Sequence, residues 1–488
     1  MKNHSTKPAN AQSTGSKTES NYSSIDKCDL NKCENAAARF LNRFAIVKLL
    51  GECGAYKEKG VPVKVILLYI FNLMFSPMSM YYQMKIGAFH EDFSKNTVYR
   101  FLENVHMNWH TFLLRLSTII IRYVVGLTDD KNNRYALIVD DTPLPKCGKA
   151  MELVSKYFNH VTMGYEYGYR VLTLAWTDGV TTIPVRYSLL ASSYDEKVRG
   201  KIRDDIDGRT LAGRIRKLAR TSMNDLTVKF AKEAIKSGIP ASIIVFDSWF
   251  AVPHTISRLK KENLTVIARL KTNSKQYYEY DGKMMNIKTL YAVSKKRRGK
   301  AAWKLSLLVN LLVKDNNKII ERIPVKIVYL PNRANKKEWI CLLSTDTEME
   351  ENEIIRQYGK RWNIELLFKC SKQYLKFGKD FQSPSFEVQN AQIALAFTRY
   401  MLIAIEQRES EDYRSCGELF MLFYQEMQDI TFIQSLSLIL ELFKEGMKKL
   451  LGVSEQQIQA VIEYVLAGLP VYLKRVLSAA NGLAQATA

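Results

Sequence analysis

The sequence predicts an α/β fold with helical regions on either side of it. Between residues 131 and 271, short apolar runs rich in strand-forming residues alternate with segments of helical periodicity. Apolar residues recur every three or four positions in 36–130, and 386–488 is again helical in pattern. Two of the strand-like runs end in carboxylates, and in α/β sheets the strand ends are where active sites are usually built.

The composition is that of a globular protein with an excess of positive charge. The chain has 488 residues, 47% of them hydrophobic, and its 71 Lys and Arg against 49 Asp and Glu give a net charge of +22. Such an excess points to a polyanionic partner, most often nucleic acid. The best apolar run, 65–75, is interrupted by Asn72 and is shorter than the ~20 residues of a membrane span. We therefore expect no membrane association.

The termini and the cysteines indicate the compartment. The first residues have no apolar core, so they do not form a secretory signal. Seven scattered cysteines without CxxC pairs argue against a disulfide scaffold or a zinc finger and favour a reducing environment. We expect a cytoplasmic protein.

Shifts in composition divide the chain into six regions. The first is polar and almost free of large apolar residues, so we expect it to be disordered. A helical region follows, then a core in two parts that are separated by a strand-rich segment, and finally a helical C-terminal region. The boundaries we assign are 1–35, 36–130, 131–271, 272–345, 346–385 and 386–488.

The helical region contains a candidate DNA-reading helix. In FSKNTVYRFLENV, Ser94 is a plausible N-cap, and exposed-type side chains follow it: Lys95, Asn96, Tyr99 and Arg100. This helix is either the recognition helix of a helix-turn-helix or an ordinary capped surface helix, and the pattern does not separate the two.

Four acidic residues stand out for their context. Asp140 and Asp141 end the apolar run YALIVDD, Asp247 ends ASIIVFD, and Glu365 lies inside a long helical segment, 351–379. Carboxylates at apolar strand ends are costly to desolvate unless a cation or metal pairs with them. Oxygen ligands suit Mg²⁺ or Mn²⁺. Taken singly, each Asp could equally be a turn cap or half of a structural ion pair.

The long helical segment carries a polar stripe. Tyr358, Arg361, Glu365 and Lys372 have offsets of 0, 3, 7 and 14, which places them within about 60° of one another on a helix. An i,i+4 surface pair accounts for Arg361 and Glu365 and leaves the alignment of the other two unexplained.

These motifs resemble a known family. The spacing Y-(2)-R-(3)-E-(6)-K in YGKRWNIELLFKCSK is similar to the YREK signature of bacterial insertion-sequence DDE transposases. The segments IVDDTPLPKCGK and IIVFDSWF resemble the first and second aspartate motifs of that family, in the same order. The likeness covers about 135–380. It implies an RNase H-like catalytic core that is interrupted by a β-strand insertion, for which 272–345 is the candidate.

The resemblance also implies the metal site. The catalytic, metal-binding residues would be Asp247, Glu365 and one of Asp140 and Asp141, because strand alternation aims only one of the pair at the metals. Asp141 abuts Thr142 and is the one we favour. Two Mg²⁺ ions, for which Mn²⁺ can substitute, would lie roughly 3.5–4 Å apart.

The same resemblance implies the DNA contacts. Tyr358, Arg361 and Lys372 would bind phosphates near the cut end. Trp362 either stacks on an unpaired base or packs structurally. By their charge alone, we expect two basic segments to add to a DNA-holding surface: 209–220, with Arg209, Arg216 and Arg220, and 295–300.

The function expected from these observations is cut-and-paste DNA transposition. The enzyme would bind the terminal inverted repeats of its insertion sequence and would cleave and rejoin double-stranded DNA at the transposon ends and the target. The alternatives are a catalytically inactive DNA-binding repressor or structural protein, and an RNase H-like nuclease without integration. Cleavage at two ends implies a homodimer in a synaptic complex, in a bacterial, nucleoid-associated setting.

Overall fold

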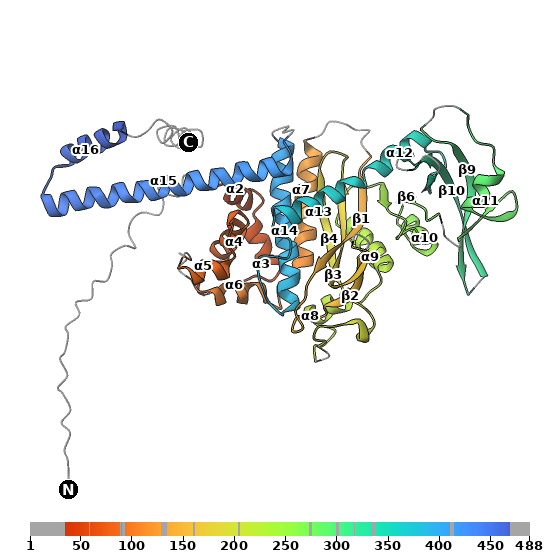
Figure 1. Ribbon diagram of the computed structural model, residues 1–488, viewed down its shortest axis with the longest axis horizontal. Coiled ribbons are helices and arrows are strands. Elements are labelled where there is room, and N and C mark those ends of the chain that lie inside the picture. The colour runs from red at the N-terminus through yellow and green to blue at the C-terminus, as the bar shows by residue number, and fades with distance from the viewer. Residues whose placement is uncertain are drawn as a thin grey trace, which may run out of the picture. The chain divides into compact units, whose positions relative to one another are not determined.

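The computed structural model places most of the chain between residues 35 and 468 (Figure 1). The polar tail expected over 1–35 lies outside the described residues except for Asn35. The chain divides into a unit of residues 36–425 and a second unit of 1–35 and 426–488. The described residues are 35–57, 59–87, 89, 93–127, 134–159, 162–203, 205–272, 276–298, 302–316, 318–332, 335, 338–409 and 414–468.

The unit of residues 36–425 is built on one mixed sheet of 11 strands among the described residues. Strand β3 pairs with β1, β2 and β4, and the order continues from β1 through β5 to β6, with β1 antiparallel to β3 and parallel to β5. The strands of the expected insertion continue the same sheet, because β11 pairs with β6. The strands are β1 Ala136–Pro145, β2 Ser155–Asn159, β3 Gly164–Thr177, β4 Thr182–Leu190, β5 Ile243–Phe246, β6 Thr265–Arg269, β7 Tyr277–Tyr280, β8 Lys283–Asn286, β9 Leu305–Asp315, β10 Lys318–Pro331 and β11 Trp339–Ser344.

Helices precede, cover and follow the sheet. The helical patterns expected over 36–130 and after 386 are confirmed for the described residues. The longer helices begin or end close to residues that cap them; for example, the Asn108 side chain accepts a hydrogen bond from the Thr111 amide at the start of α7. The α-helices are α2 Ala36–Arg43, α3 Ile46–Glu52, α4 Val63–Asn72, α5 Met80–Lys85, α6 Lys95–Leu102, α7 Trp109–Gly126, α8 Leu211–Ala219, α9 Met223–Lys236, α10 Pro253–Lys261, α11 Ile287–Val293, α12 Glu351–Gly359, α13 Trp362–Gln373, α14 Phe386–Glu409, α15 Cys416–Leu451 and α16 Glu455–Gly468.

Adjacent residues of β4 show how the two faces of the sheet are covered. The ring of Tyr187 contacts His110 of α7 and Phe397 of α14. The next side chain, Arg186, points to the opposite face, where it pairs with Glu233 of α9 at 2.6 Å. Helices α7 and α14 therefore lie on one face and α9 on the other.

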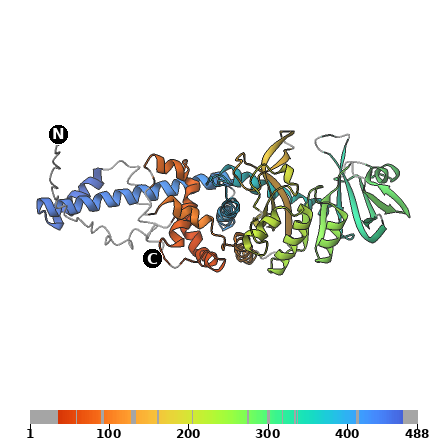
Figure 2. The ribbon, with the colours of Figure 1, turned by 90° about the horizontal axis from the view of Figure 1, so that it is seen from below.

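Helix α14 lies between the N-terminal helices and the sheet, and Figure 2 views it nearly end-on. Its residues are buried around most of the circumference, as the apolar run in QIALAFTRYMLIAI dictates. The fully buried Arg399 forms an ion pair with Asp380 at 2.5 Å and donates to the Ile70 and Leu375 carbonyls. A buried guanidinium with these partners fixes α14 against both neighbours.

Two local features differ from the sequence expectation. The segment 272–345 contains a helix, α11, because the Asn286 side chain accepts hydrogen bonds from the amides of Lys288 and Thr289 and caps it. The long helix expected over 351–379 is divided into α12 and α13. A hairpin joins β3 and β4 at Asp178-Gly179, with Gly179 at φ 107°.

The candidate DNA-reading helix is present as α6, and one of its polar residues is already engaged. The Tyr99 hydroxyl donates to the Gln382 carbonyl at 3.2 Å, and its ring contacts Phe381. Lys95, Asn96 and Arg100 are exposed. Tyr99 therefore packs against the loop before α14, and the role of the other three in DNA binding stays a prediction.

The basic segment 209–220 has a different role from the one expected. Arg216 is buried and pairs with Glu152 at 2.5 Å and Glu387 at 2.6 Å. Arg220 pairs with Asp195 at 2.5 Å. The expectation that this whole segment holds DNA is wrong for Arg216, because two carboxylates from distant parts of the chain enclose its guanidinium.

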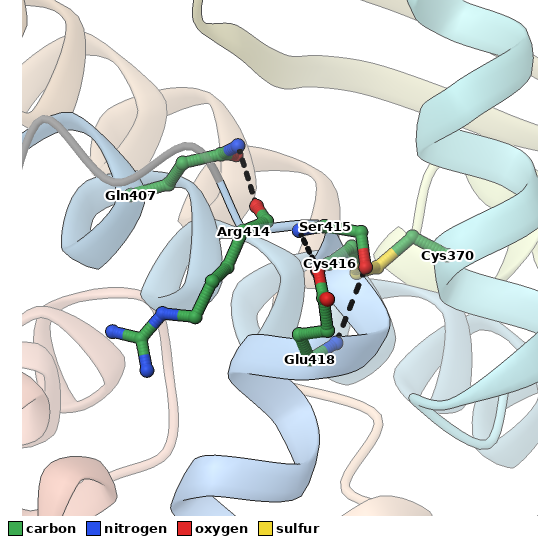
Figure 3. The surroundings of a disulfide bond; sticks show 6 residues. All are labelled: Cys370, Gln407, Arg414, Ser415, Cys416 and Glu418. Atoms are coloured by element: carbon green, nitrogen blue, oxygen red, sulfur yellow. Dashed lines mark hydrogen bonds between the residues drawn. A yellow bond between two sulfur atoms is a disulfide. The ribbon is translucent and has the colours of Figure 1, made fainter.

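One disulfide joins α13 to the start of α15. Cys370 of α13 and Cys416 are bonded, next to Ser415 and Glu418 (Figure 3). A single bridge is not a disulfide scaffold, but no sequence motif predicted it. Among the described cysteines, Cys53, Cys147 and Cys341 are free. No helix in the described part of the chain is long and apolar enough to cross a membrane.

Candidate active site

Strand β1 sends its two aspartates to opposite faces of the sheet. Asp140 and Thr142 lie on the face where α13 packs, and Asp141 lies on the other. The Asp141 amide donates to Asp140 Oδ1 at 2.8 Å, which fixes the orientation of the Asp140 carboxylate. The alternation therefore gives the two residues different surroundings.

Asp141 is held by an arginine of the neighbouring strand. Arg170 of β3 donates through Nε to Asp141 Oδ2 at 2.5 Å and through Nη2 to Oδ1 at 2.8 Å. The Asp141 side chain is only 7% exposed. This paired geometry uses both carboxylate oxygens of Asp141 in a structural ion pair.

Asp140 shares a cation with Glu365. The Arg361 guanidinium lies 3.3 Å from Asp140 Oδ2 and 2.5 Å from Glu365 Oε1. Arg361 stands at the start of α13 and Glu365 one turn later, so the polar stripe of the helix faces the end of β1. Two carboxylates that are 225 positions apart in the sequence converge on one positive charge.

Asp247 completes the acidic group. It follows β5, which is the parallel neighbour of β1, and its Oδ1 accepts a hydrogen bond from the Trp249 amide at 2.8 Å. Burial raises the pKa of Asp140 to about 7, and the negative charges of Asp141 and Asp247 act in the same direction. Asp140 and Asp247 each follow directly on a paired residue of neighbouring parallel strands, Val139 and Phe246, so the two carboxylates leave the sheet side by side.

Helix α13 is anchored at both ends. The Lys372 ammonium donates to Thr142 Oγ1 at 2.6 Å, so the last member of the stripe also contacts β1. Lys146, just beyond β1, donates to the Gly378 carbonyl at 2.5 Å. At the other end, Asn363 Nδ2 donates to Thr177 Oγ1 of β3. These contacts fix the position of Glu365 relative to Asp140.

The remaining predicted residues lie around this group with different exposures. Tyr358 packs against a core cluster that includes Ile243 and Val245, and burial raises the pKa of its hydroxyl. Trp362 is 58% exposed at the start of α13 and is therefore not a core residue.

Two contributors were not found by sequence reasoning. Arg170 gave no local signal, because its importance comes from its cross-strand position next to Asp141. Trp249 is 44% exposed and lines a cleft of about 250 Å³ beside Asp247, with the Lys271 ammonium 4.2 Å from its ring centroid. The position of Trp249, two residues after an acidic strand end, was the available signal.

Asp140, Asp247 and Glu365 are not arranged as a three-ligand metal site in this structure. Within the residues that the structure describes, no group of three or more His, Cys, Asp or Glu side chains could hold a metal ion as placed. The Arg361 guanidinium contacts both Asp140 and Glu365. The oxygen donors are nevertheless of the type that hard divalent cations prefer, and two of them already share a cation.

The chain was compared with known proteins. Residues 67–304, just under half of the chain, match the family model described as DDE superfamily endonuclease. The matched span contains Asp140, Asp141 and Asp247 and ends before Glu365. No significant match is found among curated proteins. The mixed α/β fold is consistent with a DDE nuclease, and the match supports a transposase-like nuclease of the DDE type.

Proposed function

We propose that the protein is a DNA transposase that binds the terminal inverted repeats of an insertion sequence and carries out metal-dependent cleavage and strand transfer. The observation that carries this proposal is that Asp140, Asp247 and Glu365 come together beside the YREK residues of α12 and α13. The family match supports the nuclease part, and the YREK residues motivate the assignment to insertion-sequence enzymes.

An RNase H-like core is part of the proposal. The strand order β4-β3-β1-β5-β6 supports it: three antiparallel strands come first, and two further strands run parallel to β1. Residues 272–345 enter the chain between the strand that Asp247 follows and the helix of Glu365. This position supports the expected β insertion.

We assign the first catalytic aspartate to Asp140. It shares a face and a cation with the Glu365 helix, whereas Asp141 is engaged by Arg170 on the other face. The proposal therefore replaces the sequence-based preference for Asp141 with Asp140.

Mg²⁺, or Mn²⁺ in its place, would be held by Asp140, Asp247 and Glu365. When bound, a pair of such ions activates the attacking water or 3′-hydroxyl and stabilises the leaving oxygen of the phosphodiester. Arg361 balances the charge of two of the carboxylates in the absence of metal. Lys372 lies on α13 and Tyr358 on α12, and cationic and phenolic groups of these kinds bind phosphate oxygens.

The proposed partners are the double-stranded DNA of the transposon ends and the target, and a second copy of the chain in a synaptic complex. The net charge of +22 supports a polyanionic partner. A cytoplasmic, nucleoid-associated location follows from the proposed substrate.

The test is incubation of the full-length protein with its terminal-repeat DNA and Mg²⁺. Cleavage and strand-transfer products are expected, and they should vanish in Glu365→Gln. The matched control is Glu350→Gln, which makes the same change at an exposed position that caps α12 without a side-chain hydrogen bond. Cleavage without strand transfer would instead identify a nuclease, and binding without cleavage would identify a repressor or structural protein.

A folding measurement tests the metal site independently of catalysis. A ligand that binds only the folded state raises the melting temperature. Mg²⁺ or Mn²⁺ should therefore raise the melting temperature of the wild type and of Glu350→Gln, and it should raise that of Asp247→Asn much less. Equal shifts in all three proteins would place the bound metal elsewhere.

A further inference from the structure

A two-stranded hairpin extends the sheet beyond the end of β1. Gly168 of β3 pairs with Pro145, the last residue of β1, and also with Ser155 of β2, and from Gly168 back to Gly164 strand β3 pairs with β2. Figure 1 shows β2 and the adjoining part of β3 on the side of the sheet away from α12. None of the residues assigned to the candidate active site lies on this hairpin.

One face of the hairpin is aromatic and basic. Lys156 is directly opposite Tyr167, and Phe158 is opposite Tyr165, so all four side chains project from the same face. Phe158 and Tyr165 form an edge-to-face pair with centroids 5.4 Å apart. Tyr165 remains 68% exposed, which is unusual for an aromatic side chain that already has a ring partner.

Cations lie over the tyrosines of this surface. The Lys156 ammonium is 4.8 Å from the Tyr165 ring centroid, and the Arg199 guanidinium is 4.8 Å from that of Tyr167. In the loop after β4, the Lys197 ammonium lies 4.8 Å from the centroid of the Tyr194 ring. Within the described part of the chain, none of the three cations has a carboxylate within 4.0 Å. Their charge is therefore available to an anionic ligand.

The carboxylate of the hairpin is directed away from this surface. Glu166 occupies the alternate position on β3 and accepts hydrogen bonds from Tyr157, Asn159 and Thr162 at 3.0, 2.9 and 3.0 Å. Those three donors hold it on the opposite face. Among the described residues, Glu196 is the one acid that lines the groove.

These side chains line a groove of about 560 Å³, within the ~300–1,000 Å³ of typical ligand sites. We propose that this groove binds an unpaired stretch of DNA strand, with bases stacking on Tyr165 and its neighbours and phosphates contacting Lys156, Lys197 and Arg199. Exposed rings interleaved with cations are the combination that single-stranded nucleic acid requires, since every base offers a flat face and every linkage a negative charge.

The inference rests on the proposed DNA function and adds a strand-binding site to it. Chain geometry places the groove on the continuation of β1, beyond Asp140. A strand rises by about 3.3 Å per residue. The five residues from Asp140 to Pro145 therefore place the hairpin more than about 15 Å from Asp140 along the strand. A strand held here would therefore belong to DNA beside the cut and not to the cut phosphate itself.

The experiment measures fluorescence anisotropy of the full-length protein in EDTA, where no metal-dependent cleavage occurs. The probes are a labelled single strand of about 15 nucleotides, which spans the site sizes of stacking grooves, and the duplex of the same sequence. Tyr165→Ala should weaken single-strand binding by about 5- to 150-fold, the effect of losing one base stack. Tyr165→Phe, which keeps the ring, should bind like the wild type.

Further variants separate stacking, charge and folding. Tyr464→Ala removes another highly exposed tyrosine, 82% exposed, and should leave the affinity unchanged. Arg199→Ala should reduce the slope of log affinity against log salt by about 0.7 for the single strand. Circular dichroism melting checks that each variant folds, and Arg199→Ala tests the groove even if Tyr165→Ala does not fold.

The outcomes distinguish this inference from the proposed function. Unchanged single-strand affinity in both Tyr165→Ala and Arg199→Ala overturns the groove, even if the wild type cleaves DNA with Mg²⁺. Loss of single-strand binding in these variants supports the groove, even if no cleavage is found. A change in sedimentation of Tyr165→Ala without a change in affinity overturns the groove as a DNA site and identifies a protein interface.

Discussion

His110 makes the packing of α7 and α14 on the sheet sensitive to acid. Its imidazole is 5% exposed and stacks on Tyr187 with centroids 4.6 Å apart. Asn390 Nδ2 donates to the Phe386 carbonyl, so its Oδ1 is an acceptor, and it lies 3.2 Å from His110 Nε2. We therefore assign the proton of the neutral ring to Nε2. Burial lowers the pKa of His110 to about 3, and the positive charges of Arg186 and Lys229 act in the same direction.

The sign and size of the effect follow from linkage. In the unfolded chain His110 titrates near 6.5, whereas in the fold it stays neutral down to about 3. Below pH 6.5 the unfolded state binds a proton that the native state does not, so stability present at pH 7 is lost as the pH falls. The loss between pH 7 and pH 5 amounts to about 2 kcal/mol for this one group.

The assay is urea unfolding of the full-length protein at pH 7, 6 and 5, followed by circular dichroism. Two variants, His110→Gln and His110→Phe, remove the titrating group, and the second retains a ring that can stack on Tyr187. Each has its own stability at pH 7, but in both the decrease from pH 7 to pH 5 should be about 2 kcal/mol smaller than in the wild type. If both variants lost as much unfolding free energy between pH 7 and pH 5 as the wild type does, the reasoning would be refuted. The acid sensitivity would then belong to other groups.

Further predictions concern the two aspartates, the buried arginine and the disulfide. Asp140→Asn should abolish DNA cleavage, whereas Asp141→Asn should mainly lower the free energy of unfolding, by roughly 3 kcal/mol, because Arg170 loses its partner. Cleavage assays and urea unfolding of the two variants test this. The reverse pattern would restore Asp141 as the catalytic residue. Arg216→Leu should lower the free energy of unfolding by about 3–5 kcal/mol, since Glu152 and Glu387 keep buried charges, while the exposed Arg209→Leu should change it by less than about 0.5 kcal/mol. Reducing the Cys370–Cys416 bridge, which closes a loop of 46 residues, should destabilise the wild type by about 4 kcal/mol; thermal melts with and without reductant measure this, and Cys370→Ser should be insensitive to the reductant.

The elements around the site were predictable because their signals are local. The apolar run before Asp140 and Asp141 and the shorter one before Asp247 form neighbouring strands, as their composition indicates. The stripe on the 351–379 segment faces the strand ends because its offsets place Arg361, Glu365 and Lys372 on one side of a helix.

The choice between Asp140 and Asp141 was not predictable in the same way. Alternation shows that the two point to opposite faces, but it does not show which face the helix of Glu365 covers. That depends on how α13 packs, through Lys372 to Thr142 and Arg361 to Asp140. These contacts join residues more than 200 positions apart, and no pattern within either segment contains them.

The same distinction explains the positive charge. Arg216 and Arg399 contribute to the positive charge that indicates a DNA-binding surface, yet both are buried and paired with carboxylates, Glu152 and Glu387 for Arg216 and Asp380 for Arg399. Lys156 and Arg199 carry the same charge, and among the described residues they contact aromatic rings and no carboxylate. A cation is available to DNA only where folding leaves it without an acid, so the net charge indicates the class of partner, whereas the ion pairs decide where that partner binds.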